Sequence, residues 1–166
     1  MTTTEQPWEQ RIAALWAAID DYDPADFRAR IQALTAELAP GDAIALFERA
    51  CAHDSTGQGD LAEPLYREAL AVGLTGQRRR RAVIQLSSTL RNLGQAKESV
   101  ALLSAERDAG SDALDDAVTA FLALALIDTG REREAAGLAL GALSRHLPRY
   151  NRSLANYART VVDGSR

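Results

Sequence analysis

The segment QLSSTLRNLGQAKES, residues 85–99, decides the fold. It holds Gly94, with the small residue Ser87 seven positions before it and the small residue Ser99 five positions after it. Apolar residues on both sides recur at helical spacing, and nothing alternates with the period of a strand over a useful length. The segment therefore predicts a helix, a glycine turn and a second helix, with small side chains where the two helices touch.

The same pattern occurs on both sides of this segment. Gly57 lies 37 residues before Gly94, and Gly130 lies 36 residues after it. A bulky side chain at a helix contact would cost about 1–3 kcal/mol of overpacking strain, so small residues should recur there. Small residues do stand seven before and five after each glycine: Ala50 and Ala62, Ser87 and Ser99, Ala123 and Ala135.

Helical stripes also flank the three units. The N-terminal stripe is followed by Asp23-Pro24, a helix start with Asp as the cap, and Asp42 is expected to cap the next helix after Pro40-Gly41. Such stripes would cover the ends of a stack of hairpins. Their residues are Trp8, Ile12, Leu15, Trp16 and Ile19 at one end, and Leu154, Tyr157, Ala158 and Val161 at the other.

The units resemble the tetratricopeptide repeat. Its small residues, turn glycine, aromatic and alanine match Ala50, Gly57, Ala62, Tyr66 and Ala69 one by one, although Glu106 and Ala139 depart from the pattern in later units. Over about residues 45–160, DSTG at 54–57 and QLSSTLRNLG at 85–94 resemble short stand-alone bacterial repeat proteins of uncharacterised function. That family is presumed to mediate protein–protein contact and suspected to dimerise.

The resemblance implies an all-α fold, a short right-handed solenoid of three hairpins. We expect a single domain over residues 1–166, with an N-terminal helical pair at 1–40, the repeats at 41–147 and a capping helix at 148–166. The two or three residues by which the units exceed the usual repeat length are placed in the turns near Gly73–Gly76 and Asp108–Ser111.

Composition excludes several classes of protein. One cysteine among 166 residues excludes a disulfide framework and a cysteine-based zinc site, and two histidines make a histidine-rich metal centre unexpected. A net charge of −4 argues against bulk attraction to nucleic acid or anionic membranes. The longest apolar run, 120–127, is too short to span a bilayer. With no export signal visible, a cytoplasmic location is expected.

In the family's geometry, the first helices of successive repeats line a concave groove that takes a peptide or a helix. A polar, basic centre with apolar flanks would suit a partner with an acidic group between apolar side chains. The chain is therefore expected to be a protein interaction scaffold, or a homodimer whose groove is self-occupied. The groove candidates are Phe47, Cys51, Asp54, Arg81, Ile84, Ser88, Arg91, Asn92, Leu124 and Ile127.

Two charged features allow other interpretations. Arg91 and Asp54 occupy equivalent repeat positions and would either pair with each other or bind a ligand. The run Arg78–Arg81 could touch nucleic acid, but consecutive helical residues point about 100° apart and cannot form one patch. Acidic residues of the preceding helix are expected to offset the run: Asp60, Glu63 and Glu68.

No catalytic constellation is apparent. His53, Asp54 and Ser55 are the residue types of a hydrolase triad, but adjacent helical positions cannot bring them together. Cys51 is interpreted as a semi-buried residue without a nearby partner. We therefore expect no enzyme activity, no cofactor and no metal site.

Overall fold

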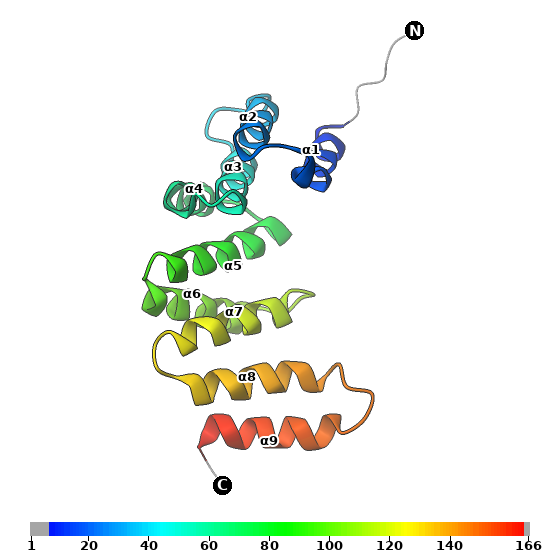
Figure 1. The fold of residues 1–166 in the computed structure, drawn as a ribbon, viewed down its shortest axis with the longest axis vertical. Coiled ribbons are helices and arrows are strands. Elements are labelled where there is room, and N and C mark those ends of the chain that lie inside the picture. The colour runs from blue at the N-terminus through cyan, green and yellow to red at the C-terminus, as the bar shows by residue number, and fades with distance from the viewer. Residues whose placement is uncertain (1–6, 165–166) are drawn as a thin grey trace. The chain divides into compact units, whose positions relative to one another are not determined.

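A computed structural model describes residues 7–164, and this range is all-α, as predicted, without a strand (Figure 1). No helix within it combines the length and apolar character needed to cross a membrane. The N-terminal elements are α1 (Trp8–Ala17), the 3-10 helix η1 (Ile19–Asp21) and α2 (Pro24–Thr35). The later helices are α3 (Ala43–Ser55), α4 (Gly59–Ala71), α5 (Gly76–Asn92), α6 (Ala96–Ala109), α7 (Asp115–Ile127), α8 (Glu132–Ser144) and α9 (Asn151–Asp163).

The packing forms two compact units, Met1–Arg78 (unit 1) and Arg79–Arg166 (unit 2). Within unit 1, α2 contacts α1 and α3, and α3 packs against α4. Within unit 2, α7 packs against α6 and α8, and α9 packs against α8. Packing between successive helices is what a series of hairpins requires. The single domain over 1–166 stays a prediction.

The three repeat glycines close their hairpins in the same way. Gly57, Gly94 and Gly130 have φ of 81°, 81° and 76°, a left-handed conformation that glycine adopts without steric cost. The amide of the residue that follows each glycine donates to the carbonyl of the residue four positions before that glycine, with N···O distances of 2.8–2.9 Å. Each first helix therefore ends in the same capped turn, which confirms the register derived from the sequence.

The small residues of the repeat are buried where helices meet. Ala50, Ala62 and Ser87 are fully buried, and Ser99, Ala123 and Ala135 are at most 6% exposed. A larger side chain at any of these positions would have to displace a helix. The prediction that recurring small residues mark the helix contacts is confirmed.

The N-terminal helices share an apolar core with α3. Ile12, Phe27, Ile31 and Ala52 are buried together, and the rings of Trp16 and Phe27 meet edge to face at 5.0 Å. Asp42 caps α3, since its Oδ1 accepts from the amides of Ile44 and Ala45. The side chain of Asp23 makes no such bond, so the cap expected at α2 is wrong although the helix does start there.

The core of unit 2 is aliphatic and joins four helices. Its members include Ile84 from α5, Leu103 from α6, Val118, Leu122 and Leu126 from α7 and Ala135 from α8.

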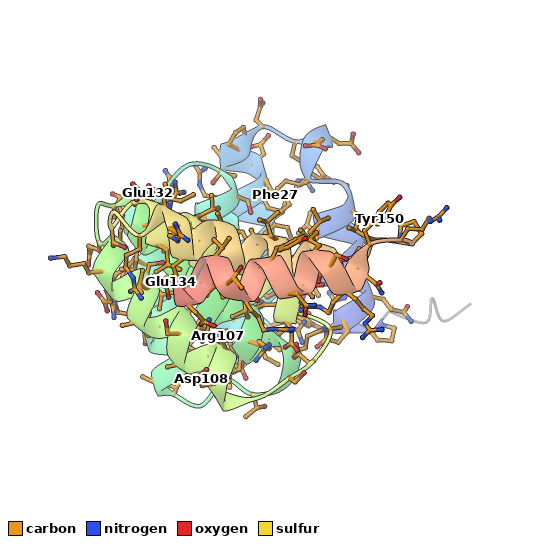
Figure 2. The ribbon with its side chains drawn as sticks, turned by 90° about the horizontal axis from the view of Figure 1, so that it is seen from below. Phe27, Arg107, Asp108, Glu132, Glu134 and Tyr150 are labelled. Carbon is orange, nitrogen blue, oxygen red and sulfur yellow. The ribbon has the colours of Figure 1, made fainter. Side chains whose placement is uncertain are left out.

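Helix α9 lies over α8 (Figure 2). Of the predicted capping stripe, Ala158 is buried and Leu154 and Val161 are half-buried, but Tyr157 is 68% exposed. Placing Tyr157 at the covered face is therefore wrong, because α8 meets α9 along the small residue beside it.

Candidate functional site

The arginine run at the start of α5 begins with a residue that holds unit 1 together. Arg78 Nε donates to Glu48 Oε1 at 3.0 Å, and Arg78 Nη2 donates to Glu9 Oε2 at 2.7 Å. Glu48 is 3% exposed and also accepts from Trp16 Nε1 at 2.7 Å. Hydrogen bonds to Glu9 and Glu48 raise the pKa of Arg78. Arg78 therefore ties α1 and α3 to the start of α5.

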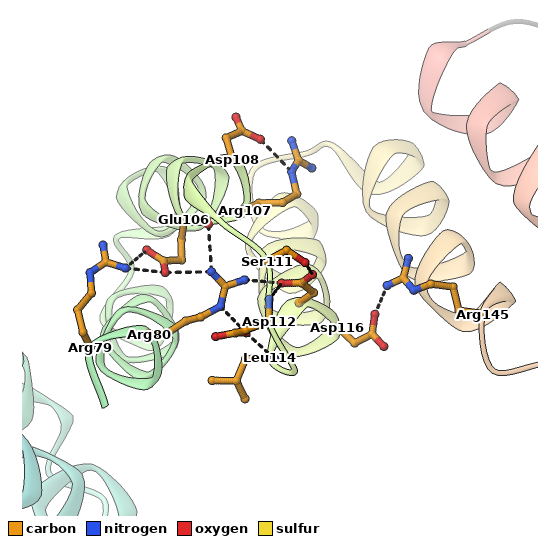
Figure 3. A network of polar contacts seen from close by, with 11 residues as sticks. Arg79, Arg80, Glu106, Arg107, Asp108, Ser111, Asp112, Leu114, Asp116 and Arg145 are labelled. Atoms are coloured by element: carbon orange, nitrogen blue, oxygen red, sulfur yellow. Dashed lines mark hydrogen bonds and ion pairs between the residues drawn. The ribbon is translucent and has the colours of Figure 1, made fainter. Parts of the chain in front are cut away.

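The next two arginines are bound inside unit 2 (Figure 3). Glu106 is 3% exposed and accepts from Arg79 Nη1 at 2.6 Å and from Arg80 Nη1 at 3.2 Å. Arg80 is itself buried, and it pairs with Asp112 of the α6–α7 connection at 2.9 Å and with Asp115, the first residue of α7, at 2.6 Å. This buried ion cluster fastens the α6–α7 connection to the start of α5.

The partners of the run differ from those expected. Asp60, Glu63 and Glu68 were predicted to offset it, but Glu63 forms its ion pair with Arg67. The observed carboxylates lie far from the run in sequence, at Glu9, Glu48, Glu106, Asp112 and Asp115. Arg78, Arg79 and Arg80 are therefore each paired with carboxylates.

Three of the predicted groove residues belong to the interior. Phe47 is fully buried, with its ring 6.3 Å from that of Tyr66. Cys51 is 2% exposed, and Ile84 is 5% exposed and packs in the core of unit 2. Their assignment to an accessible groove is wrong, because these side chains are packed in the interior.

Cys51 also lies beside Tyr66, contrary to the expectation that it has no neighbouring partner. Burial first, and then the adjacent Cys51 and Asp54 side chains, raise the pKa of Tyr66 above its ordinary value. Tyr66 Oη donates to Asp54 Oδ2 at 3.2 Å. Asp54 is therefore engaged inside unit 1.

The groove candidates of α5 and α7 are more accessible. Arg91 is half-buried and forms an ion pair with Asp128, with Nε 2.6 Å from Oδ2. The structure thus gives Arg91 a partner at the end of α7, and the Arg91–Asp54 pair stays a prediction. Leu124 and Ile127 are 40% and 47% exposed. Arg81 and Asn92 are exposed and Ser88 is half-buried.

The residues of the supposed triad have separate partners. His53 Nδ1 lies 2.8 Å from Gln58 Oε1, within the turn after α3. Asp54 accepts from Tyr66, and Ser55 is exposed at the end of α3. Among residues 7–164, no group of three or more His, Cys, Asp or Glu side chains is placed to hold a metal ion.

Unit 2 contains a cleft of about 930 Å³, which the sequence did not indicate. We call it the α7–α9 cleft. It is bounded by the α6–α7 connection and by faces of α7, α8 and α9. Its apolar lining consists mostly of small side chains: Val118, Gly137, Leu138, Gly141, Ala142, Ala155, Ala158 and Val162. Its size falls in the range of ligand-binding sites in proteins.

Two ionised aspartates lie on the wall of this cleft. Asp116 contacts His146 Nε2 at 2.7 Å and accepts from Arg145, and these two contacts lower its pKa. The Ser111 hydroxyl, followed by the Asp112 amide and Arg80, lowers the pKa of Asp115. Both carboxylates are therefore charged at neutral pH and already paired.

The comparisons with known proteins agree with this architecture. Neither the search of curated proteins nor the search of solved structures gives a match. The tetratrico peptide repeat family model matches residues 43–161, which include all three hairpins and most of α9. On this match, and on the recurring glycine turns and buried small residues, the chain belongs to the tetratricopeptide repeat family.

Proposed function

We propose that this protein is a non-catalytic interaction module that binds a segment of a partner protein. Membership of a family of protein-interaction repeats carries the proposal. The partner segment would contact the α5–α7 face, defined as Arg81, Ser88, Arg91, Asn92, Leu124 and Ile127. The Arg91–Asp128 ion pair supports this, since it brings the ends of α5 and α7 together beside the exposed Leu124 and Ile127.

Two features of this face suit a protein partner. Leu124 and Ile127 follow each other by one turn of α7, so they offer a continuous apolar contact. The nearby arginines can bind a carboxylate with two parallel hydrogen bonds. In this proposal the module acts in the cytoplasm, which the lone reduced thiol of Cys51 supports.

A quantitative pull-down from the native host tests the proposal. The variant Leu124→Asp/Ile127→Asp should lose the proteins that the wild type captures, because charged groups would replace the apolar contact. Leu61→Asp/Val72→Asp is the control, since these α4-end residues are as exposed, at 47% and 53%. Undiminished capture by the α7 variant, with unchanged helicity, would remove the α5–α7 face from the proposal.

A second candidate function is homodimerisation. Leu143, Tyr150 and Tyr157 are 50–74% exposed near or on α9, and exposed tyrosines are common at interfaces (Figure 2 labels Tyr150). Light scattering after size-exclusion chromatography distinguishes the two functions. A dimer that Tyr150→Ser/Tyr157→Ser dissociates favours self-association, whereas a monomer leaves the interaction module.

A further inference from the structure

The charge of the chain changes sign near its C-terminal end. Residues 145–164 contain four arginines and one aspartate, although the whole chain has a net charge of −4. These arginines are on α9 or in the turn before it, and two of them, Arg145 and Arg159, line the α7–α9 cleft. The cleft is therefore bordered on one side by a basic segment of the sequence.

The floor of the cleft is formed by small side chains where α8 and α9 approach closely. A Cβ built on Gly137 would lie 2.5 Å from Val162 Cγ2 and 3.0 Å from the Ala158 carbonyl oxygen. Gly141, one turn later, faces Ala158 at an ordinary distance of 3.9 Å. Beside this contact, Ala142 and Ala155 leave the cleft open. An apolar side chain of a ligand could rest there.

Most of the acidic groups on the cleft are already neutralised. Arg80 pairs with Asp112 and Asp115, and Arg145 and His146 contact Asp116. These three carboxylates are therefore already engaged, and the lining as a whole is balanced, with four arginines and four aspartates.

Two arginines on the cleft have no ion-pair partner among the described residues that line it. Arg107 lies 3.6 Å from the carboxylate of Asp108, which is its sequence neighbour and 74% exposed (Figure 3). Arg159 donates to the neutral amide oxygen of Asn156. Asp163, at the end of α9, adds one carboxylate to the lining. The cleft thus offers two guanidinium groups to a ligand against one carboxylate.

We propose that the α7–α9 cleft binds an acidic segment of a partner protein, with an apolar side chain on the Ala142–Ala155 floor and carboxylates on Arg107 and Arg159. This inference rests on the proposed function, and adds to the α5–α7 face a second contact site and a partner chemistry. Guanidinium groups recognise carboxylates through charge-assisted hydrogen bonds. Charge complementarity at the rim would accelerate binding and select the partner.

Nucleic acid fits the cleft less well. Its lining includes no aromatic side chain among the described residues, so unpaired bases would find no ring on which to stack. Tyr150 and Tyr157 do not line the cleft. A second copy joined through the same face would bring its own basic segment against this one, and like charges oppose that contact.

Selection from a displayed library of short random peptides tests the inference. We expect the wild type to enrich peptides with Asp or Glu next to large apolar residues. Fluorescence polarisation with an enriched peptide should show binding about tenfold weaker, or worse, for Arg107→Glu/Arg159→Glu. Ala155→Leu should also weaken binding by filling the floor while leaving the charge unchanged. Lys97→Glu/Arg131→Glu changes the net charge equally at exposed positions outside the cleft, and should bind like the wild type.

Each other outcome overturns the inference in a distinguishable way. Enriched peptides without acidic residues, or peptides whose binding the cleft variants leave unchanged, would remove the site while the interaction module stands. Retention of a labelled oligothymidylate, lost in Arg107→Glu/Arg159→Glu, would assign the cleft to nucleic acid. A shift of the variants from dimer to monomer would assign it to a second copy. If no peptide is enriched, both the site and peptide binding by the module are wrong.

Discussion

The two units fill equivalent helix contacts with different chemistry. In unit 1, the position twelve residues after the turn glycine is Ala69, which is fully buried close to Tyr66 in the sequence of α4. In the next hairpin, which lies in unit 2, the same repeat position is Glu106, which is 3% exposed and bound to Arg79 and Arg80, whereas the third hairpin has Ala142 there. A methyl group and a buried carboxylate thus occupy the same place in successive hairpins.

The difference shows what a repeat position requires. The contact must be filled and its polar groups satisfied, but the pattern does not require an apolar residue. Glu106 is tolerated because the guanidinium groups of two arginines on α5 bind its carboxylate. One of them, Arg80, also pairs with Asp112 and Asp115. The longer α6–α7 connection of unit 2 supplies Asp112, and α7 begins with Asp115.

Replacing Glu106 with alanine, the residue of the first repeat, should have the largest effect. It leaves Arg80 buried without its buried partner, so we expect a loss of about 3 kcal/mol in the free energy of unfolding. Asp112 and Asp115 still pair with Arg80, which keeps the loss at the lower end of the range for such changes. Urea unfolding followed by circular dichroism measures it.

The double variant Arg80→Met/Glu106→Ala is the control for this experiment. Removing both charges leaves no buried ion without its partner, although the more exposed Asp112 and Asp115 lose Arg80, so it should recover part of the lost stability. If Glu106→Ala alone is as stable as the wild type, the repeat position accepts alanine in both units, and the ion cluster contributes nothing to the stability of unit 2.

The second prediction concerns the close contact that α8 makes with α9 at Gly137. Gly137→Ala should destabilise the protein by about 1 kcal/mol, because the new Cβ would overlap Val162. Gly141→Ala should stabilise it by up to about 1 kcal/mol, because alanine favours a helix and this site has room. Equal stabilisation by both variants in urea unfolding would mean that α9 shifts away without cost.

The sequence allowed the hairpins to be predicted because their determinants are local. Gly57, Gly94 and Gly130 need a left-handed turn, and the small residues around them must be buried, so spacing alone sets the register. The N-terminal stripe is confirmed for the same reason, since a helical period identifies the face that packs. These features depend on the chain within one or two turns.

The ion pairs, the groove residues and the cleft could not be predicted in the same way, because they depend on contacts between residues that are distant in the sequence. The partners of Arg78 and Arg80 lie up to 69 residues away, so the acidic neighbours in sequence were the wrong choice. Phe47 and Ile84 are 0% and 5% exposed, and the helical period does not tell which apolar side chains neighbouring helices will cover. The α7–α9 cleft arises because α9 approaches α8 through Gly137, which no periodicity reveals. A basic segment at 145–164 was its one visible signal.

The smallest effect is expected from the surface ion pair that links α1 to Arg78 in unit 1. The hydrogen bond from Arg78 lowers the pKa of Glu9, so the pair stabilises the folded state above the ordinary glutamate pKa and loses this contribution as the pH falls through the lowered value. Glu9 is 59% exposed, and the contribution should stay below about 1 kcal/mol at neutral pH.

Urea unfolding of the wild type and of Glu9→Gln at several pH values isolates the contribution of this ion pair to the free energy of unfolding. The difference in free energy of unfolding should favour the wild type at about pH 7 and shrink as the pH falls below the ordinary glutamate pKa and through the lowered pKa of Glu9. Added salt should reduce the difference at neutral pH, because exposed charges are screened. A difference that persists at low pH would show that Glu9 acts through packing, and that unit 1 does not use this charge to hold α1.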